Sequence, residues 1–302
     1  MDKSQILATL NSAFRKEFQL GLSAVQATYG EVAMTIPSTT AINTYGWLGK
    51  FPQMRQWVGS RTIEKMAKEA MSLTNEKFEA TVSVERTDIE DDQVGMYRPM
   101  MAAMGESAAA LPDTLVWGLL KKGKTTHCYD GQYFFDAEHP VYEKADGTGT
   151  NTPTSNITTG TDNDTPNWYV FDNTKTLKPL IFQSRTDPEF EHKFDPSKSD
   201  KVFMEDVYLY GARRRCTSGF GLWQLAHLAE KTKLNKDNLA KVIATMMRIK
   251  ANGGYSLDVK PSLLVVPPEL ESIARELLEA DKINGTTNTF KGRLKVHVSV
   301  HI

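Results

Sequence analysis

The sequence predicts an α+β fold, in which helices and strand-rich blocks occupy separate stretches of one chain. Apolar residues recur at spacings of three and four over residues 3–28 and 93–122, as they do along amphipathic helices. Residues 78–87 alternate apolar and polar side chains, which is typical of a strand with one buried face. Two further helical patterns, at residues 236–251 and 268–280, complete the prediction.

The first predicted helix is followed by a predicted strand. Gly30 ends the helical pattern, and residues 31–38 alternate loosely in the way that suits a strand. The apolar stripe of this helix consists of Ile6, Leu10, Phe14, Phe18, Leu22 and Val25.

An aromatic segment, residues 44–61 (TYGWLGKFPQMRQWVGSR), separates this strand from the alternating one. It carries Trp47, Phe51 and Trp57 among glycines and a proline that interrupt any regular element, and a short helix is expected at 61–72. Two strands joined by a long aromatic loop predict an extended arm, because an isolated hairpin cannot bury its own apolar face. The alternative is that the aromatic side chains fold back onto the chain's own core.

Residues 93–122 give the clearest helical signal in the chain. Pro99 lies in the first turns, where proline is tolerated, whereas Pro112 lies in the interior and is expected to kink or split the helix. A continuous helix of this length spans roughly 45 Å, which is long for a compact domain. Its apolar stripe consists of Val94, Tyr97, Met101, Met104, Ala108, Leu111, Leu115 and Leu119.

The second half of the sequence is predicted to mix strands with the two late helices. An Asp-Gly turn lies within a turn-and-strand segment at 123–145, and residues 146–166 have the composition of a flexible surface loop. The other predicted segments are strand-rich blocks at 168–182 and 201–227, a charged connector at 183–200, a buried strand at 262–267 and a closing strand at 293–302.

Composition excludes several classes of function. The 302 residues include 36 basic and 37 acidic side chains, a formal net charge of -1, so tight binding to nucleic acid phosphates is not expected. The two cysteines, Cys128 and Cys216, lack metal-binding spacing and suit a reducing compartment. A signal peptide is not predicted, and no apolar run is long enough to predict a membrane span.

One formal match to a nucleotide-binding motif occurs at Gly118–Thr125 (GLLKKGKT), which fits G-x-x-x-x-G-K-[ST]. A phosphate-binding loop needs a strand before it and a helix after it, so that backbone N–H groups converge on the phosphates. Here a long helix precedes the match, and turn and strand follow it. The favoured interpretation is a helix end with lysines near its negative pole, and a nucleotide-binding enzyme using Lys124 and Thr125 is kept as an alternative.

A second candidate for chemistry is a cluster near residue 130. His127, Cys128, Asp136 and His139 lie close together in the sequence, so a thiol nucleophile with an imidazole base is one interpretation. Such a pair is defined by its geometry in the fold and not by adjacency along the chain. Catalysis by this cluster is therefore not predicted.

Charged runs have structural explanations. The acidic run at 88–92 lacks the spacing of a calcium loop and suits the positive end of the helix that follows. The basic run Arg213–Arg215 suits a solvated strand edge, or a salt bridge to a neighbouring subunit, better than DNA binding. No catalytic, cofactor-binding or metal-binding residue is predicted, and the chain is not expected to be an enzyme.

Several segments resemble the family of major head subunits, gpT, of Mu-like phages. The similarity runs in one order over nearly the whole chain, which is far more specific than a short motif. The segments that carry it are residues 43–61 (NTYGWLGKFPQMRQWVGSR), 78–97 (FEATVSVERTDIEDDQVGMY), 128–142 (CYDGQYFFDAEHPVY), 177–185 (LKPLIFQSR), 202–215 (VFMEDVYLYGARRR), 219–226 (GFGLWQLA) and 263–271 (LLVVPPELE).

The resemblance implies the tailed-phage capsid fold of the Hong Kong 97 type. By that resemblance, residues 1–30 would be an N-terminal arm and 31–92 an extended β-hairpin loop, the E-loop. Residues 93–145 would hold the spine helix and the start of the peripheral domain. Residues 146–302 would hold the axial domain and the remaining peripheral elements.

The resemblance also implies a function. The chain would be a non-catalytic major capsid protein that assembles with copies of itself into pentamers and hexamers of an icosahedral head, with double-stranded DNA enclosed non-specifically. It would act without a cofactor or membrane, in the virion, after assembly in the bacterial cytoplasm with scaffold or protease, portal and decoration proteins. A non-capsid oligomeric scaffold protein is the second alternative. The expected intersubunit contacts are Trp47, Phe51, Trp57, Arg61, Phe14 and Phe18.

Overall fold

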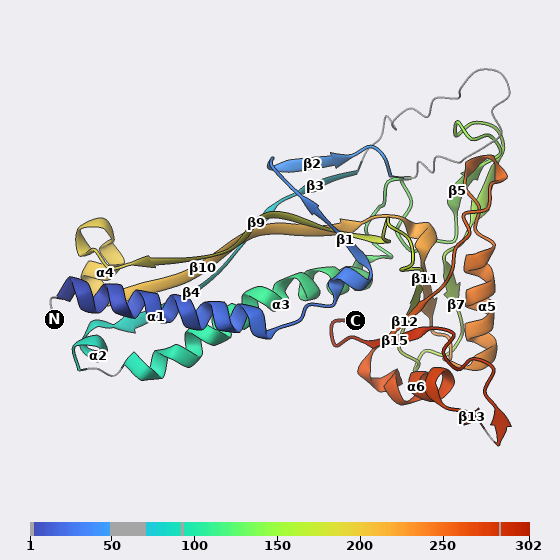
Figure 1. The fold of residues 1–302 in the computed structure, drawn as a ribbon. Coiled ribbons are helices and arrows are strands. Elements are labelled where there is room, and N and C mark those ends of the chain that lie inside the picture. The colour runs from blue at the N-terminus through green and yellow to red at the C-terminus, as the bar shows by residue number, and fades with distance from the viewer. Residues whose placement is uncertain (1–2, 49–70, 92–93, 284) are drawn as a thin grey trace.

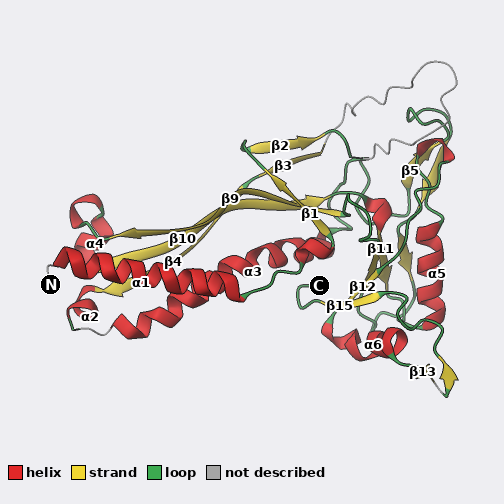
Figure 2. Ribbon diagram, in the orientation of Figure 1, coloured by secondary structure: helices red, strands yellow, loops and turns green. Residues whose placement is uncertain are grey.

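The computed structural model describes residues 3–48, 71–91, 94–283 and 285–302. Within them the chain forms two regions of different shape (Figure 1). The elongated region contains a pair of long helices and a long twisted sheet, and the compact region contains a second sheet with two helices beside it (Figure 2). The mixture of helices and sheets confirms the predicted α+β class.

The elongated region is built on a four-stranded sheet with the order β1-β9-β10-β4. β1 runs parallel to β9, and the other pairs are antiparallel. The predicted connector at 183–200 is wrong over its first part, because its backbone pairs with β10 while its charged side chains face solvent. The strands are β1 (Ala33–Pro37), β4 (Glu76–Glu85), β9 (Leu180–Lys193) and β10 (Val207–Phe220).

Two short helices lie at the free end of the elongated region, close to the described start of the chain (Figure 1). α2 (Arg86–Glu90) follows β4, and α4 (Asp200–Glu205) lies between β9 and β10. The Arg86 guanidinium donates to the carboxylate of Asp206 at 2.9 Å. This bond joins the first residue of α2 to the residue that follows α4.

The long helices α1 (Lys3–Ala24) and α3 (Arg98–Lys122) pack against each other at very short range. A Cβ atom on Gly21 would lie 1.9 Å from the carbonyl oxygen of Ala102, and one on Gly105 would lie 2.1 Å from that of Phe18. The two backbones therefore approach each other where only glycine fits. α3 is not split by proline: it runs unbroken through Pro112.

The compact region is built on a five-stranded sheet with the order β15-β12-β8-β11-β7. All four residues of β8 and of β12 are buried, because the sheet is covered on both faces. Trp168 faces a core shared with α5 (Lys236–Met247) and α6 (Glu271–Glu279), whereas Tyr169 faces the last turns of α3. The strands are β7 (Ile157–Thr159), β8 (Trp168–Phe171), β11 (Ala226–Glu230), β12 (Leu263–Val266) and β15 (Lys295–Val298).

Three two-stranded hairpins complete the described fold. The predicted loop at 146–166 is wrong in part, since it contains strands that pair with β5 and β11. The predicted helix at 61–72 lies outside the described residues except at its end, which begins a strand. The hairpins are β2 (Ile42–Tyr45) with β3 (Met71–Thr74), β5 (His139–Tyr142) with β6 (Asn151–Thr154), and β13 (Lys282–Ile283) with β14 (Thr286–Thr287).

Candidate assembly surfaces

Phe14 and Phe18, two of the predicted intersubunit contacts, are core residues of their own subunit. Both side chains are 0% exposed. The Phe14 ring meets Tyr210 edge-on with 4.9 Å between centroids, and the Phe18 ring packs against Phe190 at 5.2 Å. The prediction for these two residues is therefore corrected, because the apolar stripe of α1 is already covered by α3 and the long sheet.

Trp47 lies two residues beyond the end of β2 and is partly buried against the chain's own core. Its ring meets Tyr45 edge-on at 6.2 Å, and the Tyr45 hydroxyl donates to the side-chain oxygen of buried Gln183 at 2.6 Å. These contacts anchor the hairpin to β9. The other predicted contacts in this segment, Phe51, Trp57 and Arg61, lie outside the described residues.

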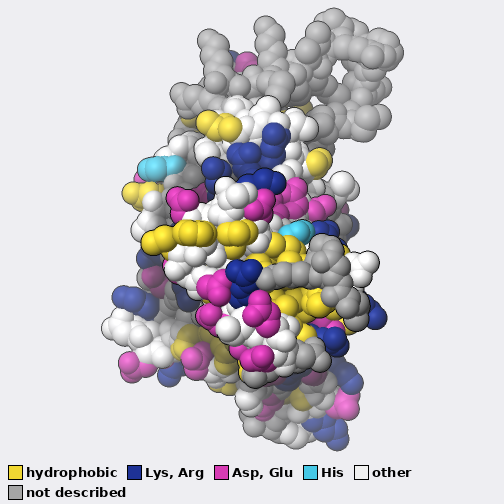
Figure 3. All heavy atoms as spheres, turned by 90° about the vertical axis from the view of Figure 1, so that its left-hand side faces the viewer, with side chains coloured by type: hydrophobic (Ala, Val, Ile, Leu, Met, Phe, Trp, Pro, Cys, Tyr) yellow, Lys and Arg dark blue, Asp and Glu magenta, His cyan; other side chains and the backbone are white. Residues whose placement is uncertain are grey.

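The most prominent apolar feature at the free end of the elongated region was missed in the sequence. Phe203 and Met204 on α4 are 70% and 77% exposed, and hydrophobic side chains gather on this end of the molecule (Figure 3). Neighbouring Val202 is buried and anchors the helix. The available signal was the apolar triplet 202–204, since three consecutive residues on a short helix cannot all face one core.

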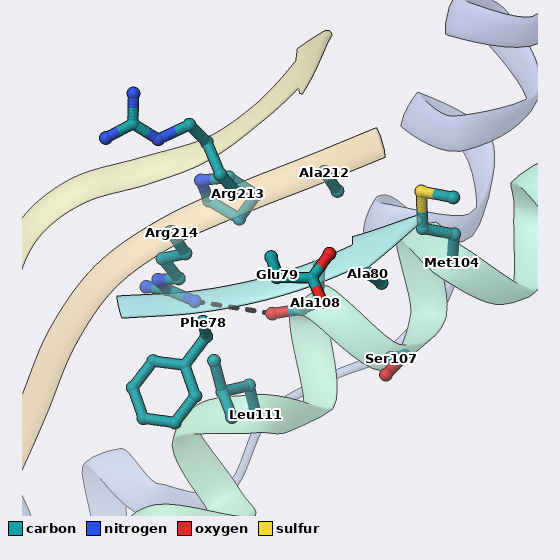
Figure 4. A pocket seen from close by; sticks show the side chains of 11 residues that line it. Phe78, Glu79, Ala80, Met104, Ser107, Ala108, Leu111, Ala212, Arg213 and Arg214 are labelled. Atoms are coloured by element: carbon teal, nitrogen blue, oxygen red, sulfur yellow. Dashed lines mark hydrogen bonds between the residues drawn. The ribbon is translucent and has the colours of Figure 1, made fainter. Parts of the chain in front are cut away.

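An apolar groove lies between α3 and strands β4 and β10, with a cavity volume of about 120 Å³ (Figure 4). Small side chains leave this space open where the helix crosses the sheet. Arg214 reaches from β10 toward Ala108 on α3, whereas the Arg213 side chain points away from the helix (Figure 4). The apolar lining consists of Phe78, Ala80, Met104, Ala108, Leu111, Pro188 and Ala212.

The basic run Arg213–Arg215 does not lie on a strand edge as expected, because β10 pairs with β9 on one side and β4 on the other. Arg213 lies 3.8 Å from the Glu191 carboxylate. Arg214 donates to the carbonyl oxygen of Ala108 at 3.3 Å and lies over the Phe182 ring, 5.2 Å from its centroid. Of the three arginines, Arg214 is therefore the one whose side chain lies at the groove.

The nucleotide-binding alternative at Gly118–Thr125 does not have the required geometry. Its first five residues belong to α3, so no strand precedes the loop. The Lys124 ammonium donates to both carboxylate oxygens of Glu230, at 2.6 and 2.8 Å, and the Thr125 hydroxyl donates to the Lys122 carbonyl. The match is a helix end held by contacts to its own last turn and to β11, in agreement with the favoured interpretation.

The cluster near residue 130 forms a buried hydrogen-bonded network. The Cys128 thiol donates to Asp130 at 2.9 Å, and the His139 Nδ1 lies 2.7 Å from the other carboxylate oxygen. His139 also stacks on Trp223 at 4.0 Å. Asp136, one of the four residues singled out in the sequence, lies outside this network, and its backbone N–H donates to the side-chain oxygen of Asn156 at 2.9 Å.

This network is unsuited to a thiol nucleophile. Burial and the negative charge of Asp130 raise the pKa of the Cys128 thiol well above its usual value, so the reactive thiolate is suppressed. Burial alone would raise the pKa of Asp130, but the hydrogen bond and charge of His139 outweigh it, so the pKa is lowered and the carboxylate stays ionised. The network joins a turn to β5 and serves packing.

Among the helices of the described residues, none has the length and apolar character that crossing a bilayer requires. The described surface is instead marked by apolar side chains on a projecting helix and by an apolar groove. An elongated helix-and-hairpin region joined to a compact sheet region, with such surfaces turned outward, defines a structural subunit suited to assembly.

Comparison with known proteins identifies the kind of assembly to which such a subunit belongs. The sequence profile of the Mu-like prophage major head subunit gpT family matches residues 7–302, so the chain belongs to that family. It is 43% identical over 300 residues to the major capsid protein of Escherichia phage Mu, covering 98% of each chain. It is 41% identical over 278 residues to the Mu-like prophage FluMu major head subunit of Haemophilus influenzae, covering 91% of this chain and 89% of that one.

Solved structures agree with the sequence relatives. The chain superposes on the procapsid subunit of bacteriophage JBD30 with a TM-score of 0.88 and 44% identity, covering 100% of both chains. The superposition on the subunit of the JBD30 capsid has a TM-score of 0.78 and 36% identity, and it covers 92% of this chain and 91% of that one. The predicted tailed-phage capsid fold is confirmed, and the chain is a structural, non-catalytic major capsid protein.

Proposed function

We propose that this chain assembles with copies of itself into pentamers and hexamers that close an icosahedral head around double-stranded DNA. The full-length similarity to the JBD30 procapsid subunit carries this proposal. Self-association also gives the exposed apolar side chains of the elongated region a partner. The nearly neutral chain, with a formal net charge of -1, suits a wall that encloses DNA without binding its phosphates tightly.

We propose for the chain the division that the resemblance implies. Residues 1–30 form the N-terminal arm, which here lies along α3, and residues 31–92 form the E-loop, to which the anchored β2–β3 hairpin belongs. Residues 93–145 hold the spine helix α3 and the start of the peripheral domain. Residues 146–302 hold the axial domain, which corresponds to the compact region, and the remaining peripheral strands.

Further partners follow from the same function. We propose that the shell is assembled in the host cytoplasm together with a scaffold or protease, a portal and decoration proteins. In one solved structure the JBD30 capsid is decorated with minor capsid protein trimers. We propose that the present chain offers its shell to proteins of these kinds and resides in the virion.

Purified full-length protein tests the assembly directly. Negative-stain microscopy and sedimentation under assembly conditions are expected to show hollow particles or five- and six-fold rings. A uniformly monomeric solution contradicts the proposal, and a defined small oligomer supports the scaffold alternative instead.

Trp47, Phe51, Trp57 and Arg61 remain proposed intersubunit contacts. Large aromatics and arginine dominate interface energetics, so Trp57→Ala is expected to lower the assembled fraction roughly tenfold while the subunit stays folded. Met247→Ala is the matched control, because this apolar side chain on α5 is 49% exposed and lies outside the proposed contacts. Equal assembly of the two variants would remove Trp57 from the interface.

A further inference from the structure

We propose that α4 of one subunit inserts Phe203 and Met204 into the apolar groove between α3 and the β4–β10 strands of a second copy. The inference rests on the self-assembly proposed above and adds a specific pair of surfaces to it. Neither surface is complementary to itself, so the contact joins two different patches and can close into a ring.

The projecting side of this contact is held rigidly by its own subunit. The Ser199 hydroxyl caps α4, buried Val202 anchors it from below, and Arg86 binds Asp206 just beyond its end at 2.9 Å. Phe203 and Met204 are therefore presented at 70% and 77% exposure by a fixed helix. A rigid anchor loses little conformational entropy on binding, which favours association.

The receiving side has the size and chemistry for one large apolar side chain. The groove's volume is about 120 Å³ and its lining is mainly apolar. An apolar cavity of about 150 Å³ in another protein accepts benzene, so a partly open groove of this size suits a phenylalanine ring or a flexible methionine. Ala80, Ala108 and Ala212 create the space, since larger side chains at the crossing would fill it (Figure 4).

The two surfaces also carry opposite charge. Residues 200–206 contain three acidic side chains and one basic one, a net charge of -2. Arg214 is the charged side chain that reaches from the sheet toward α3 at the groove, a charge of +1, whereas the cross-strand pair of Arg213 and Glu79 lies on the opposite face of the sheet. Oppositely charged rims around an apolar centre orient an approaching partner and exclude a reversed one.

The occupant is a second copy because the subunit cannot fill its own groove. Arg213 lies seven residues beyond Asp206 on extended β10, a separation of roughly 20 Å at about 3.3 Å per residue. α4 lies at the free end of the elongated region, beyond the groove-lining part of the sheet (Figure 1). The family to which the chain belongs builds shells from many copies, which supplies the neighbour.

Cysteine cross-linking tests this contact in assembled particles. The double variant Ser107→Cys with Met204→Cys places one thiol at the groove and one on α4. The native thiols are 7% and 0% exposed and stay out of the reaction. Mild oxidation of particles is expected to give reducible dimers and longer ladders on a denaturing gel, with none from either single variant.

A control pair, Ser107→Cys with Met247→Cys, uses an exposed methionine on α5 and is expected to give no product. Particles that form normally but yield no product from the 107–204 pair, or equal product from the control pair, overturn the inference and leave the proposed function intact. Absence of particles from the unmodified chain instead contradicts the proposed function.

A charge exchange covers the case in which the cysteine variants do not assemble. Arg214→Glu is expected to lower the assembled fraction roughly tenfold, and combination with Glu205→Arg is expected to restore much of it. Lys282→Glu, on an exposed strand of the compact region, is the control. A double variant no better than Arg214→Glu, with all subunits folded, counts against the contact.

Discussion

The elongated and compact regions solve the problem of burying apolar surface in different ways. In the compact region both faces of the sheet are covered, so every residue of β8 and β12 is buried. In the elongated region β4 alternates partly buried and exposed residues, because α1 and α3 cover one face only. The difference separates a region that completes its own core from one that leaves apolar side chains, including Phe203 and Met204, exposed.

A shared core joins the two regions. Tyr169 and Leu263 reach it from the compact sheet, Trp117 from α3, and Phe182 and Phe220 from the long strands. This arrangement places a rigid junction between a closed region and an open one. The following predictions test how far the two behave differently.

The largest expected effect is on the core of the elongated region. Phe14→Ala removes a fully buried ring from the contact between α1 and the long sheet, and is expected to destabilise the subunit by about 3–5 kcal/mol. Urea unfolding of the unassembled subunit measures it. Phe203→Ala is the matched control, because its ring is 70% exposed and its loss should change subunit stability by less than about 0.5 kcal/mol. If Phe14→Ala affected assembly without lowering stability, its role as a contact would be restored.

The next effect concerns the close helix crossing. Gly105→Ala places a methyl group 2.1 Å from the Phe18 carbonyl oxygen. Because a backbone atom cannot rotate away as a side chain can, the free energy of unfolding is expected to fall by about 3 kcal/mol. Gly118→Ala in the same helix has open space around the added methyl and should stabilise by up to about 1 kcal/mol. Thermal unfolding of both variants is the measurement. Similar unfolding midpoints for the two variants would show that α1 does not pack against α3 at Gly105.

The compact region is expected to dominate the pH dependence of stability above pH 5. Burial lowers the pKa of His227 to about 4, so the folded state keeps this imidazole neutral, whereas the unfolded chain takes up a proton below about pH 6.5. The unfolded state therefore binds more protons than the folded state in this range. The free energy of unfolding is expected to fall by about 2 kcal/mol as the pH drops from 7 to 5. Denaturant unfolding measures this free energy at pH 7 and at pH 5. In His227→Gln the decrease between the two pH values is expected to be smaller by that amount.

His192 in the elongated region is the comparison for that measurement. Its pKa is lowered by burial and by Arg15, but it is less enclosed than His227, so His192→Gln is expected to change the pH dependence less. An equal change from both variants would contradict the contrast between the two regions.

The smallest effect is an expected lack of reaction at the junction. Cys128 and Cys216 both belong to the shared core, and burial raises the pKa of the Cys216 thiol to about 11. At pH 8 only about one thiol in a thousand is then a thiolate, so labelling by a thiol reagent should be negligible until the subunit unfolds. Rapid labelling of the native subunit would show that the two regions separate at their junction.

Local patterns predicted most helices and the buried strands. The stripe containing Phe14 and Phe18 predicted α1, and the apolar run at 262–267 predicted β12. Both predictions were possible because the spacing of apolar side chains along the chain reflects the geometry of the helix or strand itself. The strand at the end of β9 was missed since charged side chains hid its alternation, while pairing with β10 stabilises it.

The candidate surfaces were less predictable. A stripe of phenylalanines signals that some apolar partner exists, but Phe14 and Phe18 find theirs in α3 and the long sheet of the same chain. Phe203 and Met204 lie in a short apolar triplet, which indicates that not all three side chains can face one core but not which of them project outward.

The sequence by itself determined the α+β class and a long helix predicted over residues 93–122, which is observed as α3 over Arg98–Lys122. It also determined the lack of a nucleotide-binding loop context at Lys124 and, through similarity along its whole length, the family. Only the tertiary structure decided which apolar side chains are used internally, and that Gly21 and Gly105 bring two backbones together. The physical reason is that period and propensity act within an element, whereas burial depends on which distant element packs against it.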